Sequence, residues 1–133
     1  MKQKQLIESG NWKLLVILDA CRFDVFQKVN WLPGKLEKVE SAGSTTLEWA
    51  ENTFTGYMKD VIYISPIPYI ASQYMETIHG NYRPQNHFWK IIDLWRWDSA
   101  YDSDLESVPP ERITETALQF MKWKVIAHFI QPR

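Results

Sequence analysis

Four stretches of the chain have the hydrophobic patterns of β-strands. Residues 14–18 are continuously apolar and rich in branched side chains, which predicts a strand buried on both faces of a parallel sheet. Residues 60–65 (DVIYIS), closed by two prolines, predict a second buried strand, and the apolar residues within 122–132 predict a last one. Residues 35–40 (KLEKVE) alternate polar and apolar side chains and predict a further short strand.

Helical periodicity separates these stretches. Helices are expected within residues 22–31, 46–54, 69–78, 86–96 and 111–122. In 86–96 (NHFWKIIDLWR) the apolar face would comprise Phe88, Ile91, Ile92 and Trp95, and in 111–122 it would comprise Ile113, Ala117, Leu118 and Met121, with Pro110 near the first turn. Ser44 or Thr45 is expected to cap the helix at 46–54. Without the candidate helix at 69–78, the order β-α-β-α-β-α-α-β predicts one α/β domain spanning residues 1–133, a three-layer sandwich around a mostly parallel sheet.

Composition narrows the class of protein. Of 133 residues, 45% are hydrophobic, which suffices for a core, and the formal net charge of −1 argues against a nucleic-acid partner. Cys21 is the single cysteine, which favours a reducing, cytoplasmic location over a disulfide framework. We find no signal peptide, and the longest apolar run is too short to cross a bilayer, so no membrane partner is expected.

The candidate chemistry lies where the first strand ends. Asp19 follows the apolar run directly, and ligands of open α/β sheets gather beyond the carboxyl ends of the strands. The segment 41–46 (SAGSTT) then presents hydroxyl groups at the start of an expected helix, whose positive end favours anions. Asp19 is equally suited to cap the helix at 22–31, and a Ser or Thr before a helix is commonly a cap. The residues alone leave both interpretations open.

Five segments carry a family resemblance. VILDACRFD (16–24), SAGSTTLEW (41–49), DVIYISPIPY (60–69), WRWDSAYDSDLESVPPERITETAL (95–118) and VIAHFIQP (125–132) together resemble the N-terminal part of sulfatase-like proteins of the alkaline phosphatase superfamily, archaeal members above all. The resemblance implies metal-dependent hydrolysis of phosphate or sulfate esters. It assigns metal binding to Asp19 and the role of nucleophile to Thr46, with Thr45 as the alternative one residue earlier. It also implies a divalent cation (Zn²⁺, Mn²⁺ or Ca²⁺) and an anionic small-molecule ester as substrate.

Departures from the family pattern qualify this expectation. Thr46 is followed by Leu47, Glu48 and Trp49 and not by the residues of a sulfatase signature, so the formylglycine route to sulfate esters is not expected. The chain has Arg133 where family members continue into a His, and the later Asp and His ligands of the family have no counterpart. We therefore expect a site that is incomplete in this polypeptide. The alternatives are a non-catalytic binding or assembly module that keeps the fold, and a fragment of a longer reading frame.

Other polar and aromatic residues are candidates of lower rank. Arg22 could face an anionic substrate or pair with Asp24 or Glu40. His79, His87 and His128 share no ligand spacing, and His128 is expected to be a core or strand-edge histidine with a satisfied hydrogen bond. The acidic segment 98–107 is expected to be a solvated loop. Trp89, Trp95, Trp97 and Tyr101 are expected to be core, sugar-stacking or partner-binding residues, and a shortened sandwich with uncovered faces predicts a homo-oligomer.

Overall fold

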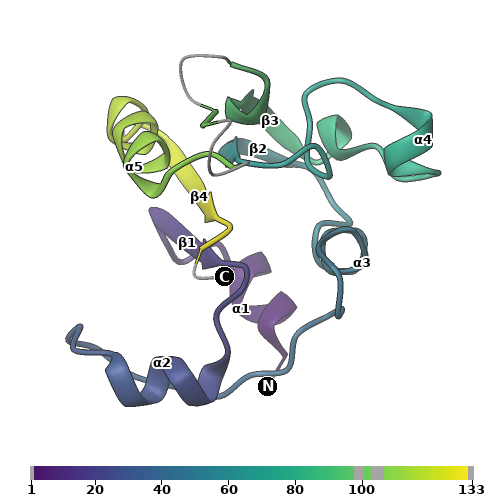
Figure 1. The fold of residues 1–133 in the computed structure, drawn as a ribbon. Helices are drawn as coiled ribbons and strands as arrows, with labels where there is room; N and C mark the ends of the chain where they lie inside the picture. Colours follow the sequence, from purple (N-terminus) through teal and green to yellow (C-terminus); the bar gives the residue numbers. More distant parts are fainter. Residues whose placement is uncertain (1, 98–100, 103–106, 132–133) are drawn as a thin grey trace.

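The computed structural model describes residues 2–97, 101–102 and 107–131, and it shows an α/β fold (Figure 1). Its described strands form one all-parallel sheet in the order β1-β4-β2-β3. The strands are β1 (Leu14–Leu18), β2 (Met58–Ser65), β3 (Phe88–Asp93) and β4 (Lys124–Phe129). The α/β class and the parallel sheet expected from the sequence are confirmed.

The described helices are α1 (Gln3–Glu8), α2 (Phe23–Val29), α3 (Thr46–Thr53), α4 (Glu76–His79) and α5 (Pro110–Gln119), with 3-10 turns η1 (Pro84–Asn86) and η2 (Leu94–Arg96). Three of them, α1, α3 and α5, pack on the faces of the sheet. On one face, Ile7 of α1 and Trp49 of α3 pack with Tyr63 of β2. On the other, Ile113 of α5 packs with Val125 of β4 and with further strand residues. The alternation of side chains along β2 and β4 thus supplies two separate apolar cores.

The prediction of a helix at 86–96 is wrong, because residues 88–93 form β3. Helical structure in this range is limited to the 3-10 turns η1, which ends at Asn86, and η2 at 94–96. Ile91 and Ile92 stand opposite Tyr63 and Ile64 of β2 in the parallel ladder. A short apolar run fits either element by its pattern, and the available edge of β2 decided the outcome.

Two other elements differ from expectation. The helix expected at 69–78 is reduced to α4, because the Ser65 hydroxyl donates to the Ile70 carbonyl and the Ser72 amide donates to Asp93, which hold this segment as a loop. The strand expected at 35–40 is absent. Its last residue, Glu40, makes one isolated parallel bridge to Lys2, away from the sheet.

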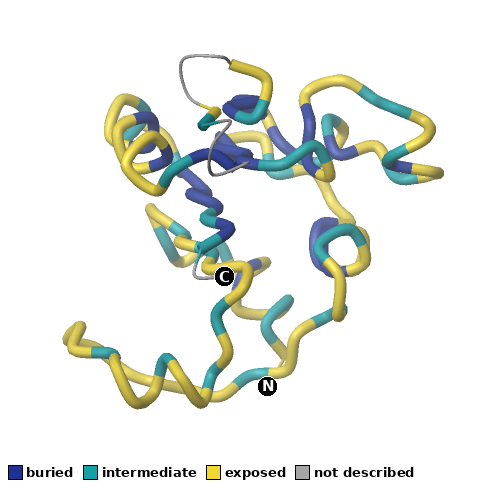
Figure 2. The backbone as a smooth tube through the Cα atoms, viewed as in Figure 1, coloured by how far each residue is buried: buried dark blue, intermediate teal, exposed yellow. Residues whose placement is uncertain are grey.

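The first strand has the expected bounds but not the expected burial. Leu14, Val16 and Leu18 are 41%, 49% and 38% exposed, so β1 is covered on one face only. β1 is an edge strand, and α5 packs mainly over its neighbour β4 and over β2. In Figure 2 many of the buried residues (dark blue) lie on β4 and β2, while α2 and the chain after it are mostly exposed (yellow).

The remaining helices agree with the pattern in the main. α3 begins at Thr46 with Thr45 as its cap, and α5 has Pro110 in its first turn. Ile113 and Ala117 are buried as expected, but Leu118 is exposed and does not belong to the buried face. Within the described part of the chain, no helix combines the length and the apolar character needed to cross a membrane.

Candidate active site at the carboxyl edge of the sheet

Asp19 and Thr46 are brought together as the sequence predicts. Asp19 follows β1, and its amide donates to the Phe129 carbonyl of β4 over 2.9 Å, so its backbone is fixed to the central part of the sheet. Thr46 is the first residue of α3, and its hydroxyl donates to Asp19 Oδ2 over 2.9 Å. Residues 27 positions apart thus join a carboxylate and a hydroxyl at the carboxyl edge of the parallel strands.

The loop before α3 is shaped by two local contacts. The Thr45 side chain accepts a hydrogen bond from the Glu48 amide over 3.2 Å, which makes Thr45 the N-cap and leaves the Thr46 hydroxyl available to Asp19. Gly43 lies so close to α3 that a Cβ there would be 2.5 Å from the backbone nitrogen of Trp49. Only a glycine therefore lets the loop approach the start of the helix this closely.

A buried histidine completes the cluster. His128 of β4 is fully buried, and its Nε2 lies 2.9 Å from Asp19 Oδ2. Its Nδ1 lies 2.7 Å from the hydroxyl of Tyr63, which is also fully buried. The four side chains Thr46, Asp19, His128 and Tyr63 form one continuous hydrogen-bonded chain from the edge of the sheet into the core.

The direction of each bond in this chain follows from Asp19. A carboxylate can only accept, so Nε2 carries the proton that His128 donates to Asp19 Oδ2. In this tautomer Nδ1 is the acceptor, and the Tyr63 hydroxyl donates to it. Burial, and then the nearby Asp19 carboxylate, raise the pKa of the Tyr63 phenol well above its ordinary value, so the phenol has a proton to donate. Asp19 Oδ2 accepts from both the imidazole and the Thr46 hydroxyl.

Sequence reasoning assigned no role at this site to His128, although a signal for it exists. Ile17 stands opposite His128 in the ladder between β1 and β4. Side chains two residues apart on a strand point to the same face. Asp19 therefore lies on the same face as Ile17 and diagonally opposite His128. The proximity of Asp19 and His128 depends on the pairing of the first strand with the last, which the pattern within a single strand does not predict.

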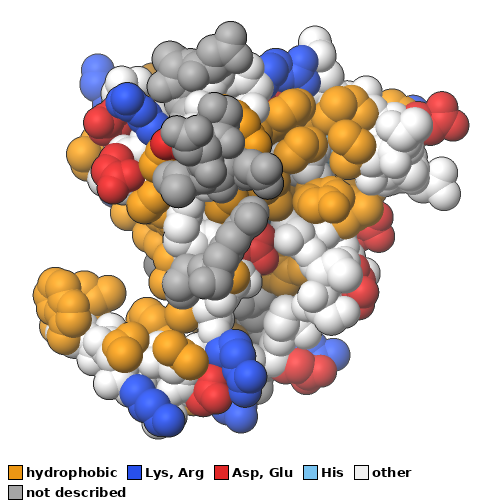
Figure 3. Space-filling model, viewed as in Figure 1, with side chains coloured by type: hydrophobic (Ala, Val, Ile, Leu, Met, Phe, Trp, Pro, Cys, Tyr) orange, Lys and Arg blue, Asp and Glu red, His pale blue; other side chains and the backbone are white. Residues whose placement is uncertain are grey.

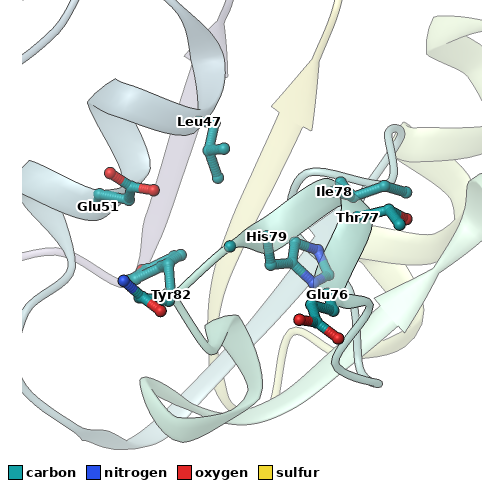
Figure 4. Close-up of a pocket in the computed structure, with 9 residues that line it drawn as sticks. Leu47, Glu51, Glu76, Thr77, Ile78, His79 and Tyr82 are labelled. Carbon is teal, nitrogen blue, oxygen red and sulfur yellow. The ribbon is translucent and has the colours of Figure 1, made fainter.

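Two hollows lie near the cluster. A cavity of about 440 Å³ opens beside Asp19 between β1, α1 and the loop before α3, with Leu15, Ile17, Cys21 and Thr45 among its lining residues. A second hollow of about 540 Å³ lies between α3 and α4, where Leu47 and Glu51 face Glu76, His79 and Tyr82 (Figure 4). Neither Asp19 nor Thr46 lines this second hollow, so the first is the one adjoining the candidate chemistry.

The other polar candidates lie in separate places. Arg22 pairs with Asp24 at 3.1 Å on an exposed surface, which is one of the expected pairings. His79 is buried, with its Nε2 2.8 Å from the Pro68 carbonyl, and His87 Nδ1 is 2.9 Å from the Gly56 carbonyl. The three histidines therefore make separate contacts.

The acidic segment and the aromatic residues give a mixed outcome. Most of the segment 98–107 lies outside the described residues, and Asp102 and Ser107 there form an isolated antiparallel bridge. Trp89, Trp97 and Tyr101 are each at least 40% exposed, and Trp95 packs partly buried against the α5 core. Trp89 and Trp97 are therefore surface residues rather than core.

The side chains described at this edge offer few ligands to a divalent cation. Asp19, the Thr46 hydroxyl and His128 Nε2 lie together, but Thr46 and His128 both donate their protons to Asp19 Oδ2. Among the described residues, no group of three or more His, Cys, Asp or Glu side chains is arranged to hold a metal ion. Hard cations take about six oxygen ligands, so these side chains do not by themselves make a metal centre.

Comparisons with known proteins add no identity to this geometry. No protein-family model, no curated protein and no solved structure matches the chain.

Proposed function

We propose that this edge of the sheet is the nucleophile-bearing part of a phosphate or sulfate ester hydrolase site of the kind found in the alkaline phosphatase superfamily. Thr46 is the proposed nucleophile. The single observation that carries the proposal is the 2.9 Å hydrogen bond from the Thr46 hydroxyl, at the first residue of α3, to Asp19 at the end of β1. A nucleophile within hydrogen-bond reach of a carboxylate, which is itself oriented by a third group, is the general arrangement for covalent catalysis.

The side chains support a definite first step. The Thr46 oxygen attacks phosphorus and its proton passes to Asp19. The P–O bond to the leaving group breaks, and the oxygen leaves with the bonding electrons as an alkoxide or, from an aryl phosphate, a phenoxide, which takes a proton from water. A phosphothreonine ester is formed. In the first turn of α3 the Glu48 amide donates to the Thr45 side chain, whereas the amides of Thr46 and Leu47 have no acceptor within the helix and would stabilise the developing negative charge. His128 holds Asp19 in place throughout, because it donates to the same oxygen.

The proposed site is incomplete with these residues alone. Binding of an anionic ester at this edge calls for cationic groups that offset its charge, and the guanidinium of Arg22 is paired with Asp24. Further cationic or metal-ligating groups, from another segment or another polypeptide, are therefore part of the proposal. No step above passes through a metal ion.

The test is the covalent intermediate. The chain is incubated with an aryl phosphate, with and without added Zn²⁺ or Mn²⁺, and its intact mass and the released phenol are measured. We expect a phosphorylated adduct on Thr46, lost in Thr46→Ala and kept in Thr46→Ser, which retains the hydroxyl.

Thr45→Ala is the matched control, because it removes the neighbouring hydroxyl while Thr46 keeps its bond to Asp19. Adduct and turnover should persist in this variant. If Thr46→Ala keeps both, Thr46 is not the nucleophile. Arg22→Ala should raise KM without changing kcat if its guanidinium exchanges Asp24 for the substrate.

A second function has a specific observation in its favour. The incomplete set of metal ligands among the described residues suits a binding or assembly module that retains the fold without turnover. Such a module would give no adduct under any metal condition and no stoichiometric metal uptake by calorimetry.

A further inference from the structure

The segment after β1 is the least buried long stretch of the described chain. None of residues 22–38, called here the arm, is buried, and α2 within it contributes no buried side chain. Figure 1 shows α2 lying apart from the sheet, and Figure 3 shows apolar side chains gathered at the tip of this projection. α2 and the turn after it carry apolar side chains that the described residues of the chain leave exposed.

The arm is strongly apolar. Its large exposed hydrophobic side chains are Val25, Val29, Trp31, Leu32 and Leu36. Trp31 is 84% exposed. Such exposure is exceptional, because Trp side chains are on average highly buried and covering one removes a large apolar area from water. An exposed cluster of this kind marks an interaction surface.

A second uncovered surface lies on the sheet. Leu14, Val16 and Leu18, called here the β1 face, point to the side on which Val125 and Ala127 of β4 are covered by α5. In a layered α/β fold a helix normally covers this position next to α5. The β1 face therefore has no helix packed on it, and the helix of the arm, α2, buries none of its side chains.

We propose that two copies of this chain form a two-fold dimer in which the arm of each copy packs on the β1 face of the other. A two-fold interface requires a self-complementary surface, and one chain here carries both the apolar helix and the apolar face. The eight side chains together expose on the order of 800 Å² per chain. That area is about what each partner buries in a standard interface, on the order of 800 Å². Exchange covers both surfaces at once.

The inference is independent of the proposed catalytic function. Exchange of an identical element between protomers is a low-cost route to a dimer, and α2, placed away from its own sheet, is the element exchanged here.

Sedimentation velocity of the full chain over a concentration series tests the proposal. We expect a dimer whose dissociation constant rises at least about tenfold in Trp31→Ser, because a central Trp is a typical hot spot. Val16→Ser on the β1 face should weaken the dimer likewise. Leu118→Ser is the control, because Leu118 is 67% exposed on α5 and belongs to neither surface, and it should leave the dimer unchanged.

Mixing the variants makes the test specific for exchange. A Trp31→Ser chain keeps an intact β1 face, and a Val16→Ser chain keeps an intact arm, so their mixture restores one of the two contacts. The mixed dimer should be tighter than either variant dimer and weaker than the wild type. Because Trp31 has no buried contacts, its replacement leaves the fold intact, which circular dichroism verifies.

Three results would overturn the proposal. The first is a wild-type chain that stays monomeric at about 100 μM, well above the range of specific affinities. The second is a dimer that Trp31→Ser and Leu118→Ser affect equally. The third is a mixture of Trp31→Ser and Val16→Ser chains that associates no better than the separate variants.

Discussion

Replacing Tyr63 with Phe isolates the contact that orients the buried histidine. Tyr63→Phe deletes one hydroxyl and keeps the ring that packs against Phe54 and Phe88. His128 Nδ1 then loses its donor at a position where His128 is fully buried. An unsatisfied buried acceptor costs about 1–3 kcal/mol, and we expect the free energy of unfolding to fall by that amount.

The assay is equilibrium unfolding in urea, with the slope of the transition checked to be unchanged. Tyr57→Phe is the background control, because Tyr57 is 59% exposed, and we expect a change within about 0.5 kcal/mol. Tyr82→Phe is the closer control: Tyr82 donates to the Phe54 carbonyl over 3.0 Å from a partly buried position, where water can replace the hydroxyl in part. Its cost should lie between the other two.

Nitrogen-15 NMR of the imidazoles provides a second readout that packing loss does not mimic. The chain has three histidines, so His128 is readily assigned. We expect the proton on Nε2 and a hydrogen-bonded, unprotonated Nδ1, whose shift moves in Tyr63→Phe. A proton on Nδ1 in the wild type, or a cost for Tyr63→Phe no larger than for Tyr57→Phe, would refute the assigned bond directions.

Three further predictions concern the same edge of the sheet. Gly43→Ala should destabilise the chain by about 1–3 kcal/mol by forcing the loop away from α3, whereas Gly56→Ala, where an added Cβ meets nothing within 4 Å, should be close to neutral in urea unfolding. Thr45→Ala should cost about 1 kcal/mol through loss of the cap on α3, measured in the same way. Because burial, and then Asp19, raise the pKa of Tyr63, the folded chain keeps a proton that the unfolded chain loses above pH 10. The contribution of Tyr63 to the free energy of unfolding is therefore fully present below pH 10 and decreases above it by up to about 1.4 kcal/mol per pH unit. Unfolding curves at increasing pH should show that Tyr63→Phe removes this part of the decline.

Periodicity predicted the parts of the fold in which local preference and tertiary environment agree. β1 has the expected bounds at Leu14–Leu18, and α3 begins after its expected cap. The segment 88–93 failed because a short apolar run suits a helix and a strand alike, and pairing with β2 decided between them. The burial of β1 failed because an apolar run does not state which of its faces another element covers.

The candidate site divides in the same way. Asp19 could be named from the sequence because it stands at the end of a strand, where open α/β sheets place their ligands. The hydroxyl groups of 41–46 could be placed at the same edge, and the family resemblance singled out Thr46 among them. Tyr63 and His128 could not, because each lies inside an apolar strand, where it resembles an ordinary core residue. Their role depends on which strands become neighbours, a property of the whole fold.

The position of β4 between β1 and β2 has a consequence for how the chain acquires its structure. β1 pairs with β4, whose residues lie more than 100 positions later in the chain, and the hydrogen bond between Asp19 and His128 spans 109 positions. Parallel pairings over such separations close large loops before any contact rewards them, and they form slowly. During synthesis, residues 14–18 must therefore wait without a sheet neighbour until β4 has emerged. Pulsed hydrogen exchange during refolding should show the amides of β1 and β4 gaining protection together, as the last event that assembles the sheet.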